Sequence, residues 1–208
     1  MRNCKIVNCQ IVQFDAVVLA NGDFPTHPLP LALLEKAPYV CACDGAVEHY
    51  PMADAVVGDG DSVPPQFRSR LIRVTEQEDN DLTKATRHCL SLGFRRILYL
   101  GATGKREDHT LGNVSLMVRY MRDFQLQPVM LTDYGYFTPA RGKTTFDSFP
   151  GQQVSIFNFG FTHIQAEGLR YTPYPYTEWW QGTLNEAAAD TFTLDADGEY
   201  LVYRTFDA

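Results

Sequence analysis

The sequence predicts an α/β protein with two parts: an N-terminal Rossmann-like, mostly parallel sheet with flanking helices, and a C-terminal antiparallel β-sandwich. Up to about residue 142, short apolar runs alternate with helical patterns, which is typical of βαβ units in a sheet covered on both faces. Further on, the segments are rich in β-branched and aromatic residues, with Gly, Pro and Asn between them. With 208 residues, 45% of them hydrophobic, the chain is long enough to bury a core. We therefore expect two domains, residues 1–142 and residues 143–208.

In the first domain we expect six short apolar strands and three helices. Prolines open the first helix, where a missing N–H costs little. The second helix places Leu82, Ala85 and Cys89 on one face and stops near Gly93. The third helix opens with acidic residues. The expected strands cover residues 15–21, 39–43, 53–58, 71–75, 95–101 and 127–133, and the expected helices cover residues 28–37, 81–93 and 108–124.

In the second domain only strands are expected. The segments that alternate, or that are rich in β-branched and aromatic residues, cover residues 152–159, 163–169, 190–194 and 199–206. No helical pattern stands between them.

Charge and composition exclude several classes of protein. The net charge of −7 argues against a sequence-independent nucleic-acid binder, which needs a basic surface. No apolar run approaches the ~20 residues of a membrane helix, and the polar start lacks the core of a signal peptide. We therefore expect a cytoplasmic protein that binds neither membrane nor nucleic acid, with its five cysteines as free thiols.

Acidic residues and glycines follow the expected strands of the first domain. Ligands of an open parallel sheet bind at the carboxyl ends of its strands, so residues far apart in sequence meet there. Any one of these aspartates alone is explained as a turn residue or a helix cap, but their recurrence at successive strand ends indicates function. The strand ends carry Asn21, Gly22, Asp44, Gly45, Asp59, Asp61, Asp81, Gly104 and Asp108.

This arrangement fits the binding of a magnesium nucleotide. Two carboxylates ~4 Å apart repel each other by about 4 kcal/mol near a protein surface, so such a cluster is usually neutralised by a cation. A site made only of oxygen ligands favours Mg²⁺ together with phosphates. Lys84 and Arg106 offer positive charge to the same phosphates, and Lys84 is poorly placed for helix stability because it lies in the first turn. The chain contains no Walker loop, no GxGxxG motif and no nucleophile elbow.

Ordered motifs over most of the chain resemble the thiamine pyrophosphokinase (thiamine diphosphokinase) family. Three of them are LANGDFP, CDGAVEHY and VVGDGDS, the last being similar to the family's Gly-Asp-Phe-Asp-Ser. EQEDNDLTKA and GATGKREDHTLGNV follow, and GTLNEA near the end is similar to Gly-x-Ser-Asn-Glu. The departures are Gly60 for Phe, Asn80 for Thr, Lys105 for Gly and Leu184 for Ser.

The resemblance implies an activity: transfer of the diphosphate of ATP to the hydroxyl of thiamine, which gives thiamine diphosphate and AMP. Residues 1–142 would be the nucleotide-binding catalytic domain and residues 143–208 the thiamine-binding domain. It also implies a homodimer whose site lies between the first domain of one subunit and the second domain of the other.

The resemblance further assigns roles to single residues. Mg²⁺ would be held by Asp59, Asp61 and Asp81, with Asp44 and Asp108 in the same acidic cluster, and either of these two could accept the proton of the alcohol. Lys84 and Arg106 would lie near the phosphates, Asn21, Gly22, Gly45 and Gly104 would shape the ATP site, and Gln77 and Asn185 would contact thiamine.

Two other functions stay open. Leu184 removes a polar group beside the acceptor pocket, so the acceptor could be another alcohol, such as a hydroxymethyl-pterin. A non-catalytic nucleotide sensor is the other alternative. Retention of the whole acidic set and of Lys84 speaks against it, since sensing needs no metal-aligned attack.

Overall fold

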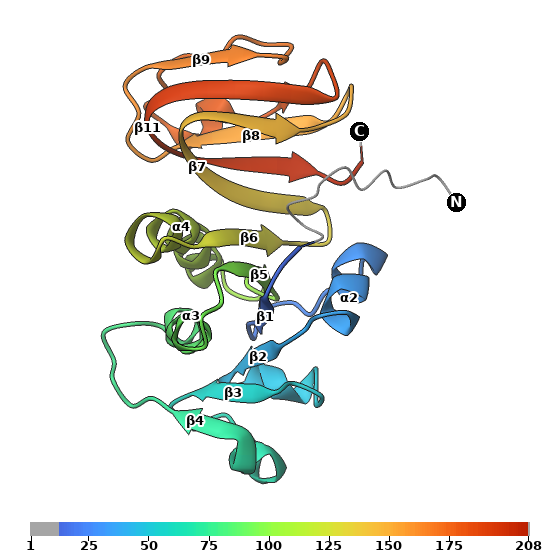
Figure 1. The fold of residues 1–208 in the computed structure, drawn as a ribbon, viewed down its shortest axis with the longest axis vertical. Coiled ribbons are helices and arrows are strands. Elements are labelled where there is room, and N and C mark those ends of the chain that lie inside the picture. The colour runs from blue at the N-terminus through green and yellow to red at the C-terminus, as the bar shows by residue number, and fades with distance from the viewer. Residues whose placement is uncertain (1–12, 208) are drawn as a thin grey trace.

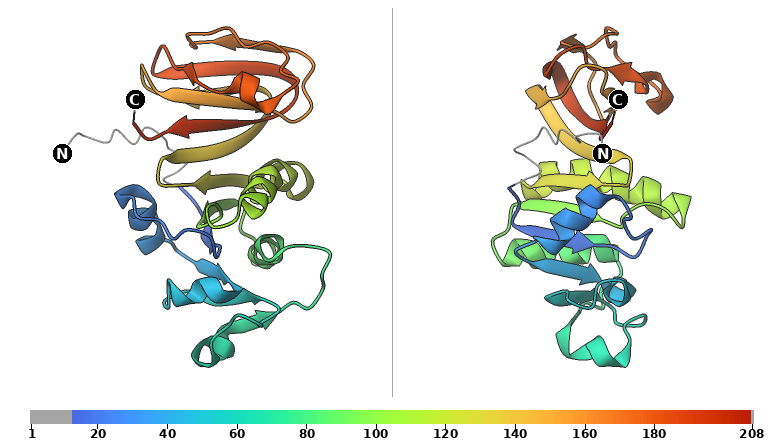
Figure 2. Two further views of the ribbon diagram at one scale, coloured as in Figure 1. Left: turned by 180° about the vertical axis from the view of Figure 1, so that it is seen from behind. Right: turned by 90° about the vertical axis from the view of Figure 1, so that its right-hand side faces the viewer.

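The structure is a computed structural model that describes residues 13–207. Its strands form one eleven-stranded sheet in the order β10-β8-β11-β7-β6-β5-β1-β2-β3-β4, with β9 paired to β11 (Figure 1). The expected α/β class is confirmed, with parallel strands at one end and antiparallel strands at the other. The two further views show the same arrangement, with the antiparallel strands stacked above the parallel ones (Figure 2).

The parallel half contains the six expected strands. Every pair among them is parallel, with β1 at the centre between β5 and β2. The chain therefore moves outward from β1 in one direction to β4, and then returns to place β5 and β6 on the other side. The six strands are β1 (Ala16–Leu19), β2 (Val40–Cys43), β3 (Ala55–Gly58), β4 (Leu71–Arg73), β5 (Arg96–Leu100) and β6 (Gln127–Leu131).

Three helices cover the two faces of this half, α2 on one side and α3 with α4 on the other (Figure 1). The strands supply both cores by alternation: Val17 and Leu19 of β1 face the α2 side, whereas Ala16 and Val18 face α3 and α4. The three expected helices are confirmed as α2 (Pro28–Glu35), α3 (Asp81–Ser91) and α4 (Glu107–Phe124). No helix among the described residues combines the length and apolar character needed to cross a membrane.

Short 3-10 helices that the sequence patterns did not predict lie in three of the connections. They are η1 (Asp44–Glu48), η2 (Pro65–Arg70) and η3 (Trp179–Gly182). The first of them begins at Asp44, directly at the end of β2, and so fixes the position of that carboxylate.

The antiparallel half folds over a core of its own, which includes Phe146, Phe192 and Tyr200. Its strands are β7 (Gly135–Asp147), β8 (Gln153–Asn158), β9 (Ile164–Glu167), β10 (Asn185–Glu186) and β11 (Thr191–Thr205). The segments 190–194 and 199–206, expected as two strands, form the single strand β11. A register shift between Asp195 and Glu199 replaces the turn that the intervening Asp-Ala-Asp-Gly suggested.

Strand β7 was not expected, and it joins the two halves. It pairs with β6 at Tyr136 and Phe137 and with β11 along most of its length. The expected domain boundary between residues 142 and 143 falls inside this strand. At that point Gly142 has a φ of +66°, opposite the register shift of β11, so β7 bends there rather than ending.

Candidate functional site

Two loops at the carboxyl ends of β1 and β5 pack backbone against backbone. The N–H of Gly22 donates to the carbonyl of Gly101 (2.7 Å), and the N–H of Asp23 donates to the carbonyl of Thr103 (2.9 Å). A Cβ on Gly22 would lie 2.3 Å from the carbonyl oxygen of Thr103, so only glycine allows this approach. The loops meet where the strand order reverses direction, which is the usual ligand-binding position in an open α/β sheet.

A cavity of about 370 Å³ opens at this position. It collects side chains and backbone from the ends of β1, β2 and β5, from the turn after β3 and from the starts of α3 and α4. Six of the expected site residues line it: Asn21, Gly22, Asp44, Asp81, Gly104 and Arg106. Gly45 stands next to it, because a Cβ there would lie 3.1 Å from the amide nitrogen of Asn21.

Asp44 is buried and organises the turn that follows β3. Its carboxylate accepts hydrogen bonds from the backbone N–H groups of Gly60 (3.1 Å) and Ser62 (3.0 Å). The residue has a φ of +40°, a conformation that non-glycine residues adopt rarely. Such backbone strain persists where the surrounding contacts determine it, and here the contact is with the loop that carries Asp59 and Asp61.

Asp81 and Lys84 form an ion pair at the start of α3. The ammonium nitrogen of Lys84 lies 3.3 Å from the carboxylate of Asp81, and the Lys84 side chain is 3% exposed. Burial raises the pKa of Asp81, Lys84 opposes this effect, and the carboxylates of Asp44 and Asp59 add to the increase. The pKa of Asp81 therefore lies above its ordinary value, and the three carboxylates interact electrostatically.

The aspartates expected to bind Mg²⁺ are not preassembled into a metal site. Across residues 13–207, no three Asp, Glu, His or Cys side chains gather closely enough to hold a metal ion. Asp59 accepts a hydrogen bond from the N–H of Asp61 (3.0 Å), Asp61 is exposed, and neither lines the cavity. The carboxylates nevertheless offer oxygen atoms, which are the ligands that Mg²⁺ prefers. The negative charges of Asp44 and Asp59 contribute to the raised pKa of Asp81, so the three carboxylates interact.

Asp108 is engaged with Arg106 and does not line the cavity. Both oxygens of the carboxylate accept hydrogen bonds from the guanidinium, at 3.0 and 2.5 Å. Both side chains are exposed, and Asp108 is not among the residues that line the cavity. The hydrogen bonds from Arg106 lower the pKa of Asp108 to about 2. This carboxylate is therefore a weak proton acceptor near neutral pH.

Gln77 and Asn185, expected on the thiamine side, lie at opposite ends of the strand order. Gln77 is exposed in the segment after β4, and its amide donates to the carbonyl of Thr75 (3.3 Å). Asn185 is buried in β10, and its amide bridges to the backbone of Tyr171 (2.8 and 3.2 Å). Within one chain the structure does not bring either residue to the cavity.

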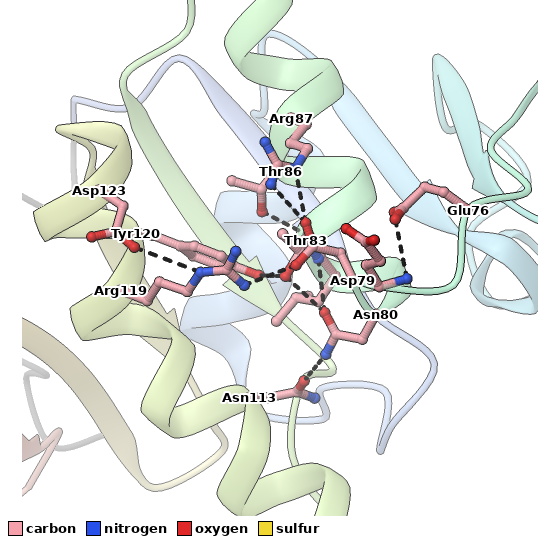
Figure 3. A network of polar contacts seen from close by, with 12 residues as sticks. Glu76, Asp79, Asn80, Thr83, Thr86, Arg87, Asn113, Arg119, Tyr120 and Asp123 are labelled. Carbon is pink, nitrogen blue, oxygen red and sulfur yellow. Dashed lines mark hydrogen bonds and ion pairs between the residues drawn. The ribbon is translucent and has the colours of Figure 1, made fainter.

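Several polar residues at the site were not expected. Asn80 caps α3 by accepting from the N–H of Thr83 (3.0 Å), and its amide donates to Asn113 (3.1 Å). Figure 3 shows this contact between Asn80 and Asn113. Asn113 in turn donates to the carbonyl of Ala102 (2.8 Å), so α3, α4 and the loop after β5 are connected. Lys105, also a cavity residue, donates to the carbonyl of Asn21 (3.0 Å). A cap signal at Asn80 was available in the sequence, but the pairing of Asn80 with Asn113 was not.

Beside this chain of amides lies a charged cluster around Asp79. Its carboxylate accepts from Arg119 (2.8 Å) and from Arg87 (2.7 and 2.9 Å), which joins the loop before α3 to both helices (Figure 3). Burial alone would raise the pKa of Asp79, but the two guanidinium groups outweigh it and lower this pKa. The cluster fixes the loop that leads to Asp81.

Fold and cavity together define an open α/β protein with a polar cavity at its topological switch point, lined by both acidic and basic side chains. Two family models match the chain: "Thiamin pyrophosphokinase, catalytic domain" at residues 31–130 and "Thiamin pyrophosphokinase, substrate-binding domain" at residues 135–203. The chain belongs to the thiamin pyrophosphokinase family.

Relatives and solved structures agree with this family. Thiamin pyrophosphokinase 1 of Caenorhabditis elegans is 32% identical over 117 residues, which cover 49% of this chain and 47% of that protein. The alignment thus spans about half the length of that relative. The thiamin pyrophosphokinase of Candida albicans superposes with a TM-score of 0.78 at 16% identity, over 96% of this chain and 91% of that one. The thiamine pyrophosphokinase of Bacillus subtilis superposes with a TM-score of 0.74 at 16% identity, over 93% of this chain and 100% of that one. At these identities the two structures establish the shared fold.

Proposed function

We propose that this chain is a thiamine diphosphokinase, which transfers the diphosphate of ATP to the hydroxyl of thiamine and releases AMP. The observation that carries the proposal is the buried Lys84 beside Asp81 at the carboxyl end of the sheet, in a chain that both domain models of the family match. A buried cation in the first turn of a helix opposes the helix dipole, so an anionic ligand explains it better than fold stability does. The first domain would bind ATP, and the second would contribute to binding thiamine.

The residues of the first cavity would position and neutralise the triphosphate. Diphosphoryl transfer depends mainly on positioning and charge stabilisation. Lys105 and Arg106 line the cavity and supply positive charge there, whereas Lys84 does not line it and lies behind Asp81, which does. The Gly22 and Gly104 loops would allow the phosphate oxygens to approach the backbone. The guanidinium of Arg106, now held by Asp108, would turn to the phosphates.

Mg²⁺ fits the donor set, and we propose that Asp59, Asp61 and Asp81 hold it. Once bound, the ion would neutralise charge on the phosphate oxygens. Asp44 would position the turn of residues 59–62, which carries Asp59 and Asp61, because its carboxylate accepts two hydrogen bonds from backbone N–H groups of that turn.

We further propose a homodimer with a shared site. Gln77 and Asn185 cannot meet at one thiamine molecule within the strand order of a single chain, but residues from two chains can. Large apolar side chains are exposed in the antiparallel half, including Trp180 at 72% and Leu184 at 75%. Such side chains mark contact surfaces, and their burial against a second chain would bring Asn185 towards the partner's cavity.

For the location we propose the cytoplasm. Of the five cysteines expected as free thiols, Cys41, Cys43 and Cys89 are buried free thiols in the structure, and Cys4 and Cys9 lie outside the described residues. Cysteines that stay unpaired are typical of a reducing compartment.

The test is incubation with Mg-ATP and thiamine, with the products read by mass spectrometry. The expected products are thiamine diphosphate and AMP in equal amounts, and removal of divalent cations with EDTA abolishes both. A second incubation, with a hydroxymethyl-pterin in place of thiamine, tests the alternative acceptor. Leu184 motivates this test because its exposed, apolar side chain stands where the family motif has a polar serine. Binding of ATP and thiamine without AMP formation would identify a sensor instead.

A further inference from the structure

A chain of side-chain hydrogen bonds runs from the core of the parallel half into the first turn of α3. The hydroxyl of Tyr120, in α4, lies 2.7 Å from the hydroxyl of Thr83. Thr83 in turn donates to the side-chain oxygen of Asn80 (2.8 Å), the residue that caps α3 (Figure 3). Tyr120 and Thr83 are both buried, so their hydroxyl groups depend on protein partners rather than on water.

The direction of each bond in this chain follows from the number of available protons. The side-chain oxygen of Asn80 also accepts from the backbone N–H of Thr83 (3.0 Å), which fixes the orientation of the Asn80 amide. A hydroxyl group carries a single proton, and Thr83 uses its own on Asn80. The proton between Thr83 and Tyr120 therefore comes from the phenol, and Tyr120 is the donor at the buried end of the chain.

Two neighbouring elements hold this turn at three points. Helix α4 contacts it through Tyr120 and again through Asn113, which accepts from the amide of Asn80 (3.1 Å). Because Asn113 precedes Tyr120 by two helical turns, both side chains lie on one face of α4. The thiol of Cys43, at the end of β2, donates to the carbonyl of Asp81 (3.6 Å). A rotation of the turn would have to break these bonds.

The same turn carries two charged side chains of the candidate site. Asp81 lines the cavity, and Lys84 forms its ion pair behind that carboxylate. Thr83 lies between them in the chain, so a displacement of Thr83 also displaces Asp81. A shift of about 1 Å in a group that acts in catalysis can lower the rate by roughly 10²-fold.

We infer that Tyr120 is a positioning residue for the reaction: its hydroxyl holds the first turn of α3 and thereby the carboxylate of Asp81. This inference rests on the proposed function, which assigns Asp81 to Mg²⁺. Tyr120 is not among the residues to which the sequence motifs point, and its place in the core is also compatible with a purely structural role. The experiment must therefore separate positioning from stability.

A second buried tyrosine provides a matched control. The hydroxyl of Tyr99, in β5, lies 3.0 Å from the hydroxyl of Thr86, which donates to the carbonyl of Leu82 (2.7 Å). Thr86 lies about one turn further along α3 than Thr83, and the rings of Tyr99 and Tyr120 stack with their centroids 5.6 Å apart. Thr86 also hydrogen-bonds to Tyr120, so it keeps a hydroxyl neighbour when Tyr99 is replaced. Tyr99→Phe thus removes a similar hydroxyl and leaves the first turn bonded.

The test compares Tyr120→Phe with Tyr99→Phe. Both variants lose one buried hydroxyl, so both are expected to lower the midpoint of urea unfolding. Only Tyr120→Phe is expected to lower kcat, by about tenfold, and to raise the Mg²⁺ concentration at half-maximal rate by about threefold. The KM for thiamine should stay within about a factor of two in both variants, and so should the kcat of Tyr99→Phe.

Hydrogen exchange of backbone N–H groups gives a second measurement, which needs neither metal nor nucleotide. The N–H groups of Thr83 and Lys84 both donate to Asn80 at the start of α3. Their exchange should be about tenfold faster in Tyr120→Phe than in the wild type, and unchanged in Tyr99→Phe. Thr83→Ser keeps the hydroxyl and should retain the wild-type kcat, whereas Thr83→Val keeps the shape and should behave like Tyr120→Phe.

Equal losses of kcat in the two phenylalanine variants would overturn the inference, because the hydroxyl of Tyr120 would then act on stability alone. Unchanged exchange at Thr83 and Lys84 in Tyr120→Phe would overturn it too, and so would a wild-type kcat in a folded Thr83→Val protein. If exchange responds as expected but the wild type forms no thiamine diphosphate, the proposed function fails, while Tyr120 is still shown to hold the turn.

Discussion

The ammonium group of Lys84 lies 3.3 Å from the carboxylate of Asp81 and is almost completely shielded from solvent. Both residues belong to the first turn of α3, where the positive end of the helix dipole disfavours a cation. The carboxylate of Asp81 offsets part of that cost. A phosphate in the adjoining cavity would offset more of it, which links the pair to ligand binding.

Replacement of Lys84 by methionine is therefore expected to separate activity from stability. Met fills a similar volume and removes a cation that the helix dipole disfavours, and the remaining carboxylate of Asp81 keeps contact with water because its side chain is 41% exposed. Loss of a cation that stabilises charge in the transition state typically lowers kcat by about 10²–10³-fold. The measurements are the rate of AMP release and the midpoint of thermal unfolding. Lys36→Met, at an exposed position after α2, is the matched control. Retention of the wild-type rate in Lys84→Met would remove Lys84 from the site.

Asp61→Asn is expected to lower turnover far more than stability. The side chain is exposed, and its own carboxylate holds no hydrogen bond to the turn, which depends on Asp44 and Asp59 instead. Turnover and urea unfolding would be measured side by side, with Asp190→Asn as an exposed control in the antiparallel half. An unchanged rate of AMP release in Asp61→Asn would contradict the assignment of this residue to Mg²⁺.

Two glycine-to-alanine substitutions are expected to have opposite effects on stability. Gly22→Ala places a Cβ 2.3 and 2.4 Å from two backbone carbonyl oxygens, and separating the loops should cost about 1–3 kcal/mol. Gly112→Ala lies in α4 with open space around the new Cβ, and should gain about 0.5–1 kcal/mol from helix propensity. Chemical denaturation measures both values. Equal effects of the two substitutions would show that the loops after β1 and β5 are not tightly packed.

Asp79→Asn is expected to destabilise the protein and to change its response to acid. The side chain is 10% exposed and loses charge-assisted bonds to Arg87 and Arg119, at a cost of about 1–2 kcal/mol. Because the folded-state pKa of Asp79 lies below its ordinary value near 3.9, its contribution is complete above that pH. The contribution is lost as the pH falls through the folded-state pKa.

Unfolding free energies at pH 7 and pH 3 test this relationship. The difference between wild type and Asp79→Asn should be full at pH 7 and smaller at pH 3, which lies below the ordinary pKa, so that the carboxylate of the unfolded chain takes up its proton. Glu78→Gln, an exposed neighbour, serves as the control. A difference that stays constant over this range would show that the ion pairs do not stabilise the loop.

The parallel half could be predicted because its strands are buried on both faces and read as apolar runs. The runs at 39–43 and 53–58 became β2 and β3 with small changes at their ends. Strand β7 was not predicted because it spans the change in composition near residue 143, where the domain boundary was expected. In the structure β6 pairs with β7 only at Tyr136 and Phe137, so Pro139 of β7 lies beyond that pairing. Gly142, with its positive φ, forms a bend within β7.

The acidic residues at the site could be predicted as a group, because the carboxyl ends of parallel strands lie at the same edge of the sheet. The partners of these residues did not follow from it. Nothing in the sequence pattern separates Asp108, paired with Arg106 in solvent, from Asp44, buried beneath the 59–62 turn. The cavity lined by Tyr134, Phe137 and Tyr203 was not predicted for another reason. Phe137 belongs to β7 and Tyr134 to the turn before it, and β7 was not expected at all.

Strand β7 also restricts how the protein can move. It is hydrogen-bonded to β6 of the parallel half and to β11 of the antiparallel half, so the two halves share a continuous backbone ladder. A hinge between them would have to break that ladder, unlike the linker of a two-domain enzyme that closes around its substrate. In the proposed function, a ligand would therefore enter the cavity past the loops after β1, β3 and β5, which line it.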